Sequence, residues 1–472
     1  MELQSMLTKN KGVPAVMQRY FCFQCSIILL IVSLWMTALP AFAEEPREIT
    51  LDAAISLALK LNKQLSVAQL EMEKARAKYH EALGGALPKL TGSGQYTRNI
   101  KSPVFFLPNA ILTGGRIREG TTPVAFAQKN SYLGSISLSQ PLFIGQVYEG
   151  ISIAYTSYNL ALESYESAKT QTVLNVKRAF YGVLLAREAA ALAEMSLKNA
   201  EENLKNVQRM NSQGLVSDYD LIRARVQVDN LRPYAMQAHD QYELSKNYLK
   251  MAIGLSPDEP ITVLGDLSFA PRDSVISVED AQRIALANNY DLRQLEFRVE
   301  LAQQSVTLEK YGHYPSLVAF GNYQWQAQAD NFQFSEYLWA KSFVLGIQLQ
   351  IPIFNGFQTA SKVQQAEITF DEAKKQRDAF VDKLKTDVAS IVYRVQQARK
   401  RVEAQTQSIG QAEKAYQIAR SRYNAGLGTQ LEVNDAEVAM TQSKVNYLQA
   451  VYDYLIAQAE LDQVLGKQVS LQ

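Results

Sequence analysis

Cysteine is nearly missing from this 472-residue chain, and the two copies that it has, Cys22 and Cys25, both lie in the first 43 residues. The rest of the chain can therefore hold no disulfide and carry out no thiol chemistry. Histidine is almost as scarce. No G-x-S-x-G sequence, phosphate-binding glycine loop or catalytic carboxylate pair with a nucleophile stands out. The three histidines lack the spacing of metal ligands: His80, His239 and His313. We expect a protein that is not an enzyme and has no cofactor or resident metal.

An excess of charge of either sign is also missing. The 48 lysine and arginine residues are balanced by 47 aspartate and glutamate residues, so nothing predicts a nucleic-acid partner. After the N-terminal segment, no run of residues is apolar over the length of a transmembrane helix. If the protein lies in a membrane, it must do so through strands.

The first 43 residues have the pattern of a secretory signal peptide. A basic stretch that ends at Arg19 precedes an apolar run over residues 26–39, and residues 41–43 (Ala-Phe-Ala) give a cleavage pattern. The alternative is a membrane anchor that is retained. A start at Met17 would give a signal of more ordinary length. Both cysteines precede the apolar run, whereas a lipoprotein cysteine follows it, so no lipidation is predicted.

The longest helical pattern covers residues 356–424. About 69 residues in one helix would form a rod roughly 100 Å long, which no single compact domain needs. The turn RYNAGLGT (residues 422–429) then leads into a second helical pattern over residues 430–465. Small or apolar residues recur every three or four positions along one face of the long helix: Ala366, Phe370, Ala373, Phe380, Leu384, Val388, Ile391, Val395, Ala398, Val402, Ile409, Ala412, Tyr416, Ala419 and Tyr423.

The chain also reads as a tandem duplication. Residues 49–96 align without a gap on 276–323, and the match resumes with Pro141 against Pro352 and continues to Gly254 against Gly466. We therefore divide the chain into a first repeat (44–255), a proline-containing linker (256–277) and a second repeat (278–472). The first repeat carries 16 extra residues, which fall within 101–129 and are predicted to be an exposed loop.

Each repeat is predicted as helix, strand, loop, strand, long helix, turn and helix. The shorter helices are expected over 51–86 and 217–253 in the first repeat, and over 278–312 and 430–465 in the second. In each repeat the two shorter helices add up to about the length of the long one, 145–210 or 356–424. We therefore expect two short helices stacked end to end along each long helix. Separate antiparallel bundles are the alternative.

Four segments alternate polar and apolar residues as strands do: 90–99, 132–140, 317–328 and 343–351. In the last of them Leu345, Ile347 and Leu349 oppose glycine and glutamine. Uncharged polar residues opposite apolar ones are typical of lipid-facing outer-membrane strands, and a half-buried soluble hairpin is the alternative. Four strands cannot close a barrel, so subunits must combine. Two subunits would give eight strands and three would give twelve.

Taken together, several segments resemble the TolC family of outer-membrane channels over nearly the whole chain after the signal peptide. They are 50–62 with 277–289, Pro88 with Pro315, SQPLF (139–143) with QIPIFNG (350–356), and the tips 213–224 and 422–436. The resemblance implies a mainly helical trimer in the outer membrane, with a shared twelve-stranded β-barrel and a coiled-coil α-helical tunnel across the periplasm. It implies a passive exit duct that docks a periplasmic adaptor and an inner-membrane transporter of the RND or ABC class, for efflux or type I secretion.

The resemblance also assigns residues at the periplasmic end. The family's ring of acidic residues falls on Glu432 and Asp435, and its tip tyrosine falls on Tyr423. The basic residue that braces the closed tip falls on Gly428, which has no side chain to do so, and Arg422 is a candidate substitute. The alternative for the two carboxylates is a solvated helix face. Three copies of both around a narrow axis would repel anions and hold cations.

The two tips share a glycine-leucine pair, Gly214-Leu215 and Gly426-Leu427. A reversal within a few residues needs backbone positions with positive φ, which glycine supplies. In the family these tips also dock the adaptor. Ser217 and Thr429 are expected to be N-caps of the returning helices.

Two other kinds of protein compete with the duct. A periplasmic adaptor also has long helical hairpins, but it should show one hairpin and a lipoyl-like β domain rather than a duplication. A structural coiled-coil scaffold would have no pore. Whether the cargo is a drug, a metal ion, a siderophore or a polypeptide is left open by the sequence.

Overall fold

The computed structural model describes residues 47–467, except 113, 118, 126 and 272–275. The predicted signal peptide, with Cys22 and Cys25, lies outside the described residues. By its contacts the chain divides into a small unit that includes residues 258–262 and a large unit of residues 49–257 and 263 onward. The helices and the four-stranded sheet belong to the large unit. Among the described helices, none combines the length and the apolar character that a membrane crossing requires.

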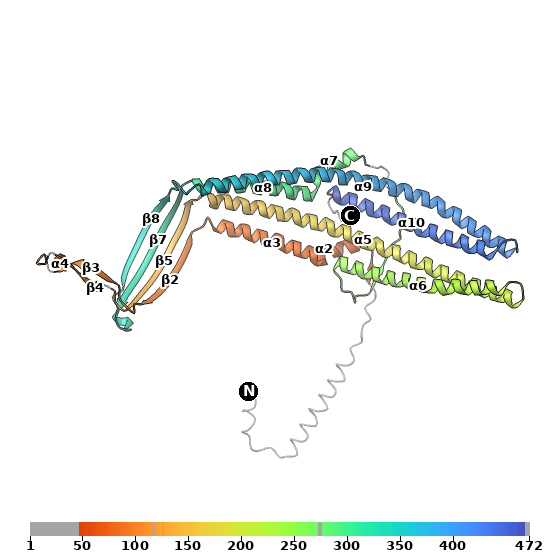
Figure 1. Cartoon of the computed structure of the whole chain (residues 1–472), viewed down its shortest axis with the longest axis horizontal. Helices are drawn as coiled ribbons and strands as arrows, with labels where there is room; N and C mark the ends of the chain where they lie inside the picture. Colours follow the sequence, from red (N-terminus) through yellow and green to blue (C-terminus); the bar gives the residue numbers. More distant parts are fainter. Residues whose placement is uncertain (1–46, 113, 118, 126, 272–275, 468–472) are drawn as a thin grey trace, which may run out of the picture. The chain divides into compact units, whose positions relative to one another are not determined.

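Two long helical hairpins make up most of the large unit (Figure 1). In one, α5 (Gly145–Ser212, 68 residues) is followed by α6 (Asp218–Ile253); in the other, α9 (Gln358–Asn424, 67 residues) is followed by α10 (Gln430–Val464). The two helices of each hairpin pack along one another. At 1.5 Å per residue, α5 and α9 are each roughly 100 Å long. The predicted long helices and the turns that reverse them are thereby confirmed.

The face predicted from the small and apolar residues of 356–424 is the face that α9 buries. Leu384, Val388 and Val402 are almost inaccessible to solvent, and the other predicted positions are buried or half-buried. Full burial of an aliphatic side chain stabilises a fold by about 1.5–3 kcal/mol, so this stripe is what holds α9 in place. Along its length α9 packs on α8 nearer the sheet, on α7 and, nearer the tip, on α10.

The shorter helices correct one prediction. Residues 51–86 and 278–312 were each expected to form one helix. The structure breaks them into α2 (Leu51–Leu61) and α3 (Lys63–Gly84), and into α7 (Val278–Asn288) and α8 (Tyr290–Lys310). The breaks fall at Asn62 and Asn289, whose ψ angles of 121° and 122° are extended rather than helical.

Each asparagine joins two helices and also fixes the end of a third. The amide oxygen of Asn62 accepts from the backbone N–H of Leu65 at 2.9 Å, and its Nδ2 donates to the carbonyl of Ala252 at 2.8 Å, near the end of α6. Asn289 repeats the arrangement, accepting from the N–H of Leu292 at 3.0 Å and donating to Val464 at 3.1 Å. Both asparagines are therefore N-caps and cross-links at once.

A glycine completes each junction. Gly254 and Gly466 follow α6 and α10 with φ of 97° and 64°. A Cβ on Gly254 would lie 2.3 Å from the carbonyl oxygen of Leu61, and one on Gly466 would lie 2.2 Å from that of Asn288. Only glycine fits positions that combine positive φ with so close a backbone contact. The ends of α6 and α10 are thus packed directly against the breaks.

Loss of one junction asparagine gives a local prediction. We expect Asn289→Ala to raise hydrogen exchange of the amides at Asp291 and Leu292 by about tenfold or more, because it removes an N-cap worth about 1 kcal/mol and leaves the Val464 carbonyl without its donor. Asn289→Ser is the matched control, since its hydroxyl keeps an oxygen for the cap while the amide donor is lost and no charge enters this buried position. We expect it to show a smaller increase. Unchanged exchange in Asn289→Ala would contradict this role.

The four predicted strands are confirmed as one antiparallel sheet of order β2-β5-β7-β8 (Figure 1). They are β2 (Lys89–Arg98), β5 (Asn130–Phe143), β7 (Ser316–Ala329) and β8 (Ala340–Gln350). Leu138 pairs with both Leu90 and Gly321, and Gly321 pairs in turn with Leu345. Since side chains alternate between faces, this register places most of the apolar residues of the four strands on one face, whereas Val318, Phe320 and Val344 lie on the other.

Residues 101–129, predicted as an exposed loop, contain regular structure of their own. β3 (Val104–Pro108) pairs with β4 (Thr121–Ala125), and the four-residue helix α4 (Asn109–Leu112) lies between them. Asn109 holds the end of this hairpin, since its Nδ2 donates to the Glu119 carbonyl at 3.0 Å and its Oδ1 accepts from Thr122 at 2.6 Å. The apolar run VFFLP within the insertion was the signal for a strand that we missed.

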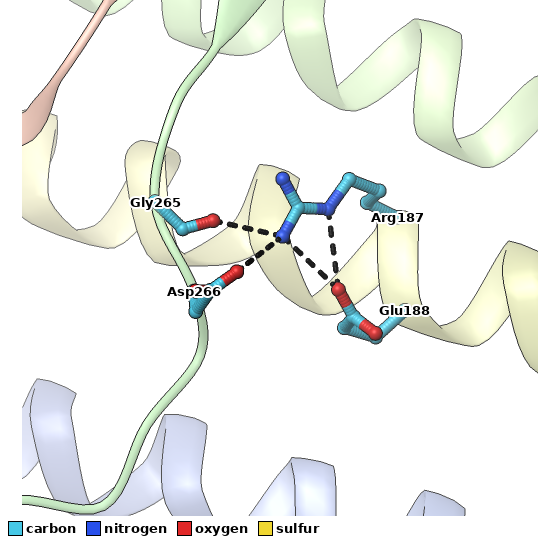
Figure 2. A network of polar contacts seen from close by, with 4 residues as sticks. All are labelled: Arg187, Glu188, Gly265 and Asp266. Carbon is cyan, nitrogen blue, oxygen red and sulfur yellow. Dashed lines mark hydrogen bonds and ion pairs between the residues drawn. The ribbon is translucent and has the colours of Figure 1, made fainter.

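The linker, residues 256–277, is also more ordered than expected. β6 (Ile261–Val263) pairs with β1 (Arg47–Ile49). The linker residues that follow β6 are fastened to α5 by Arg187, whose Nη2 donates to the Gly265 carbonyl at 2.8 Å and lies 3.4 Å from Asp266 (Figure 2). Glu188 holds the guanidinium from the other side at 3.0 Å. The hydrogen bond to the Gly265 carbonyl fixes the linker more than the ion pair with Asp266 does. The Asp266 carboxylate is almost fully exposed, and an ion pair in water contributes little stability.

Candidate functional site

The two helical tips have the same backbone. Gly214 and Gly426 both have φ of 73°, and the residue after each closes the turn by donating its N–H back into the preceding helix. The N–H of Leu215 donates to the Met210 carbonyl, and that of Leu427 to the Arg422 carbonyl, both at 2.9 Å. This is the glycine-terminated helix end that satisfies otherwise unpaired carbonyls. It leaves both leucine side chains exposed, at 66% and 72%.

Hydroxyl groups start the returning helices. Ser217 is the N-cap of α6 and forms a capping box, in which its Oγ accepts from the N–H of Asp220 at 3.2 Å and its own N–H donates to that carboxylate at 3.3 Å. Thr429 is the N-cap of α10, and its Oγ1 accepts from the N–H of Glu432 at 3.3 Å. Both serve as the helix starts that the sequence suggested.

The tips are braced from within by different side chains. At the first tip Asn211 Nδ2 donates to the Val216 carbonyl at 3.1 Å, and at the second Arg422 donates to the Leu427 carbonyl at 3.2 Å. A Cβ on Gly428 would come within 3.3 Å of the Cβ of Arg422. The absence of a side chain at Gly428 therefore leaves room for the arginine, which braces its own turn.

Glu432 and Asp435 lie at the start of α10, three residues apart and both exposed. This spacing places them on one side of the helix. Neither forms an ion pair within the described part of the chain. A structural role is available to Glu432 alone, since a carboxylate in the first turn interacts favourably with the helix dipole. Asp435 lies beyond that turn, so the dipole does not account for it.

Tyr423 is the aromatic residue of the second tip. It lies in the last turn of α9 and is half-buried; burial, together with the nearby carboxylate of Asp220 on α6, raises the pKa of its hydroxyl. Burial is the main cause of that rise, and no hydrogen bond joins Tyr423 to Asp220 in the described part of the chain. Glu432 and Asp435 are exposed, and the Glu432 carboxylate lies beside Gly428, 3.1 Å from where a Cβ on that glycine would be.

Sequence reasoning missed a set of polar contacts behind the tips. Asn199 Nδ2 on α5 donates to Glu437 Oε1 on α10 at 3.0 Å, and one turn further the hydroxyls of Ser196 and Thr441 lie 3.4 Å apart. No motif marks these residues, because each is an ordinary polar residue at a helix position. Only the packing of α5 against α10 reveals them.

The sheet presents two chemically different faces. On β8 the side chains of Phe343, Leu345, Ile347 and Leu349 are 59–68% exposed. On the opposite face hydroxyl and amide groups meet across strands, as in Ser93 with Ser135 at 2.8 Å and Ser137 with Asn322 at 3.1 Å. A sheet with one exposed apolar face and one uncharged polar face suits a boundary between lipid and water.

The sheet is also incomplete. β2 and β8 are its outer strands, and within the described residues each pairs on one side only. An exposed apolar face is unfavourable in water, and the unpaired backbone N–H and C=O groups of the two outer strands are unfavourable in lipid. Each outer strand therefore has a side on which a strand of another chain could pair. No group of histidine, cysteine, aspartate or glutamate among the described residues could hold a metal ion.

Comparisons with known proteins agree with this geometry. The sequence model of the outer membrane efflux protein family matches residues 54–255 and 282–467. The outer membrane protein TolC of Vibrio cholerae is 23% identical over 335 residues, 70% of this chain and 76% of the relative. The alkaline protease secretion protein AprF of Pseudomonas aeruginosa is 23% identical over 412 residues, 86% of this chain and 82% of the relative.

Solved structures share the fold. The CmeC outer membrane channel of Campylobacter jejuni superimposes with a TM-score of 0.73 at 18% identity, covering 88% of this chain and 85% of that chain. The outer membrane protein VceC of Vibrio cholerae gives a TM-score of 0.72 at 18% identity, covering 88% and 96%. At this level of identity the likeness concerns the arrangement of helices and strands.

Proposed function

The chain belongs to the outer membrane efflux protein family, and from this premise we propose that it is the outer-membrane exit duct of an efflux or secretion system. The observation that carries the proposal is the continuity between a sheet with one lipid-type and one polar face and helices roughly 100 Å long. The sheet suits the outer membrane and the helices suit the periplasm. With balanced charge and no catalytic motif, the duct is passive, and a partner supplies the energy.

Three copies form the duct in this proposal. Four strands per chain with two open edges become a closed twelve-stranded barrel, in which every edge is paired. The helices offer a matching surface, since Tyr219, Ile222 and Val226 of α6 are exposed at spacings of three and four residues. Such a stripe is typical of a helix that packs on another helix. The two similar halves of each chain would then give the trimer six similar sectors, the outcome of the proposed tandem duplication.

The tips form the periplasmic end. Glu432 and Asp435 of three subunits line the aperture, and Arg422 and Tyr423 hold the tips together. The exposed turns at Gly214-Leu215 and Gly426-Leu427 dock a periplasmic adaptor, which connects the duct to an inner-membrane transporter of the RND or ABC class. Exposed leucines on rigid turns support this use, because small apolar anchors suit a helical partner.

The first experiment is single-channel recording of the purified protein from Glu44 onward in planar bilayers. We expect stable, small, cation-selective conductance steps, because the acidic aperture is the narrowest and most charged part of the duct. Well-folded trimers that never conduct would favour a scaffold, or a tip closed without its pump. Arg422→Ala with Tyr423→Phe separates these two cases, since only a closed duct gains conductance when the tip contacts are removed.

A further inference from the structure

Glu437 lies two residues beyond Asp435 on α10 but has a different neighbourhood. Two residues correspond to a rotation of about 200° around an α-helix, so the two side chains leave α10 in nearly opposite directions. Asp435 is exposed, whereas Glu437 is half-buried against α5. The same short stretch of helix therefore carries an outward acid and, behind it, an acid that contacts its own subunit.

The contact behind the aperture joins the two hairpins. α5 belongs to one hairpin and α10 to the other, and at this level Asn199 Nδ2 donates to Glu437 Oε1 at 3.0 Å. The hydroxyls of Ser196 and Thr441, 3.4 Å apart, continue the contact one turn further from the tip. These bonds fix how closely the start of α10 approaches α5.

The charge on Glu437 is the adjustable part of this contact. Burial raises the pKa of its carboxyl group, while the Asn199 bond and the nearby Arg420 of α9 partly offset that rise. Tyr416 of α9 is the other titratable group near it, and burial raises the pKa of the Tyr416 hydroxyl, which keeps that group neutral. The charges of Glu437 and of Glu202 on α5 both contribute to that raised pKa. Glu437 is the carboxyl group that is hydrogen-bonded across the contact.

We propose that Glu437 is a positioning residue of the aperture, which holds α10 against α5 and so sets how far Glu432 and Asp435 lie from the axis of the duct. This inference rests on the proposed function, in which those two carboxylates line the opening. The residue touches no cargo. It acts through the helix that carries the aperture carboxylates, because the three acids share two turns of α10.

The direction of the pH effect follows from the burial. A carboxyl group whose pKa is raised in the packed arrangement favours that arrangement when protonated, and the favourable contribution is lost as pH rises through the raised pKa. Acidification therefore tightens the contact between α5 and α10, and a more alkaline medium loosens it. Glu437→Gln imitates the protonated form at every pH, whereas Glu437→Ala removes the partner of Asn199.

The contact can be measured without reference to conduction. Since the described chain and the predicted mature protein contain no cysteine, Ser196→Cys with Thr441→Cys places one reporter pair across it. In trimers at one fixed pH near 7, we expect the disulfide to form roughly threefold faster with Glu437→Gln than with Glu437, and more slowly with Glu437→Ala. Glu413→Gln is the matched control, because its partner Lys444 ties α10 to α9 instead; it should leave the rate unchanged.

Conductance then connects the contact to the aperture. Between pH 5 and pH 8 the parent channel should conduct less as the pH falls, and Glu437→Gln should remove at least part of that slope while keeping conductance low. Equal disulfide rates in all variants, or parent and Glu437→Gln channels with the same pH profile, would overturn the inference. If no variant conducts, the parent included, and Arg422→Ala with Tyr423→Phe does not conduct either, the proposed duct fails, and the disulfide rates still decide whether Glu437 controls the contact.

Discussion

A protein carrying Glu432→Ala and Asp435→Ala is expected to lose its block by multivalent cations such as cobalt hexammine added on the periplasmic side. In the proposed trimer the double change removes six carboxylates from one narrow ring. Each is exposed and lacks an ion pair in the described chain, so its charge is available to a cation in the pore. We expect the blocking concentration to rise at least about tenfold, which corresponds to 1.4 kcal/mol of binding free energy. Cation selectivity should fall in the same recordings.

The control has to carry the same change of charge away from the tip. Asp382 and Asp387 of α9 are exposed and lie far along the helix from the tip, so Asp382→Ala with Asp387→Ala should leave the block within about twofold of the parent. Normal block in the Glu432 and Asp435 variant would show that the two carboxylates form no more than a solvated helix face. Loss of block in both double variants would point to a diffuse field instead.

Substitution of Leu345 by arginine is expected to prevent most of the protein from reaching the outer membrane as a trimer. Leu345 lies in the middle of β8 on the apolar face and is 68% exposed. An arginine in the lipid-facing centre of a barrel strand costs about 2–4 kcal/mol, and a trimer would carry three of them. We would measure trimers that resist sodium dodecyl sulphate in isolated outer membranes, and expect a severalfold loss.

The adjacent residue supplies the control. Val344 precedes Leu345 on the same strand, is also apolar and half exposed, but shares the opposite face with Ser137 and Asn322. We expect Val344→Arg to assemble normally, because its charge would face water inside the barrel, and to alter ion selectivity. Equal losses for both variants would contradict the assignment of the two faces. Normal assembly of Leu345→Arg would favour the soluble hairpin.

The sequence could predict the elements of this fold because their patterns are long. A stripe that repeats over fifteen positions of one helix, or an alternation that runs the length of a strand, averages out a single exception. Arg377, a charged residue that interrupts the stripe of residues 356–424, is such an exception. The two tips could be predicted equally well from the sequence, since a glycine with positive φ is needed wherever a helix reverses so sharply.

Features held by one residue could not be found in this way. Nothing in residues 51–86 distinguishes Asn62 from any polar residue within a helix until the Ala252 carbonyl is seen to lie opposite its amide. Glu437 likewise looks like one more acid on a polar helix, because its function in the fold depends on Asn199, which is 238 residues away. Such roles depend on partners from distant parts of the chain, and a local pattern contains no information about them.

The two open edges of the sheet have a consequence for inheritance. In the proposed trimer a subunit cannot pair its sheet edges alone, so normal and defective copies made in the same cell would share trimers. When a variant retains its edges but has a damaged tip, the supply of fully normal ducts falls as the cube of the normal fraction. A damaged tip would then act as a dominant trait, whereas a damaged edge, excluded from assembly, would be recessive.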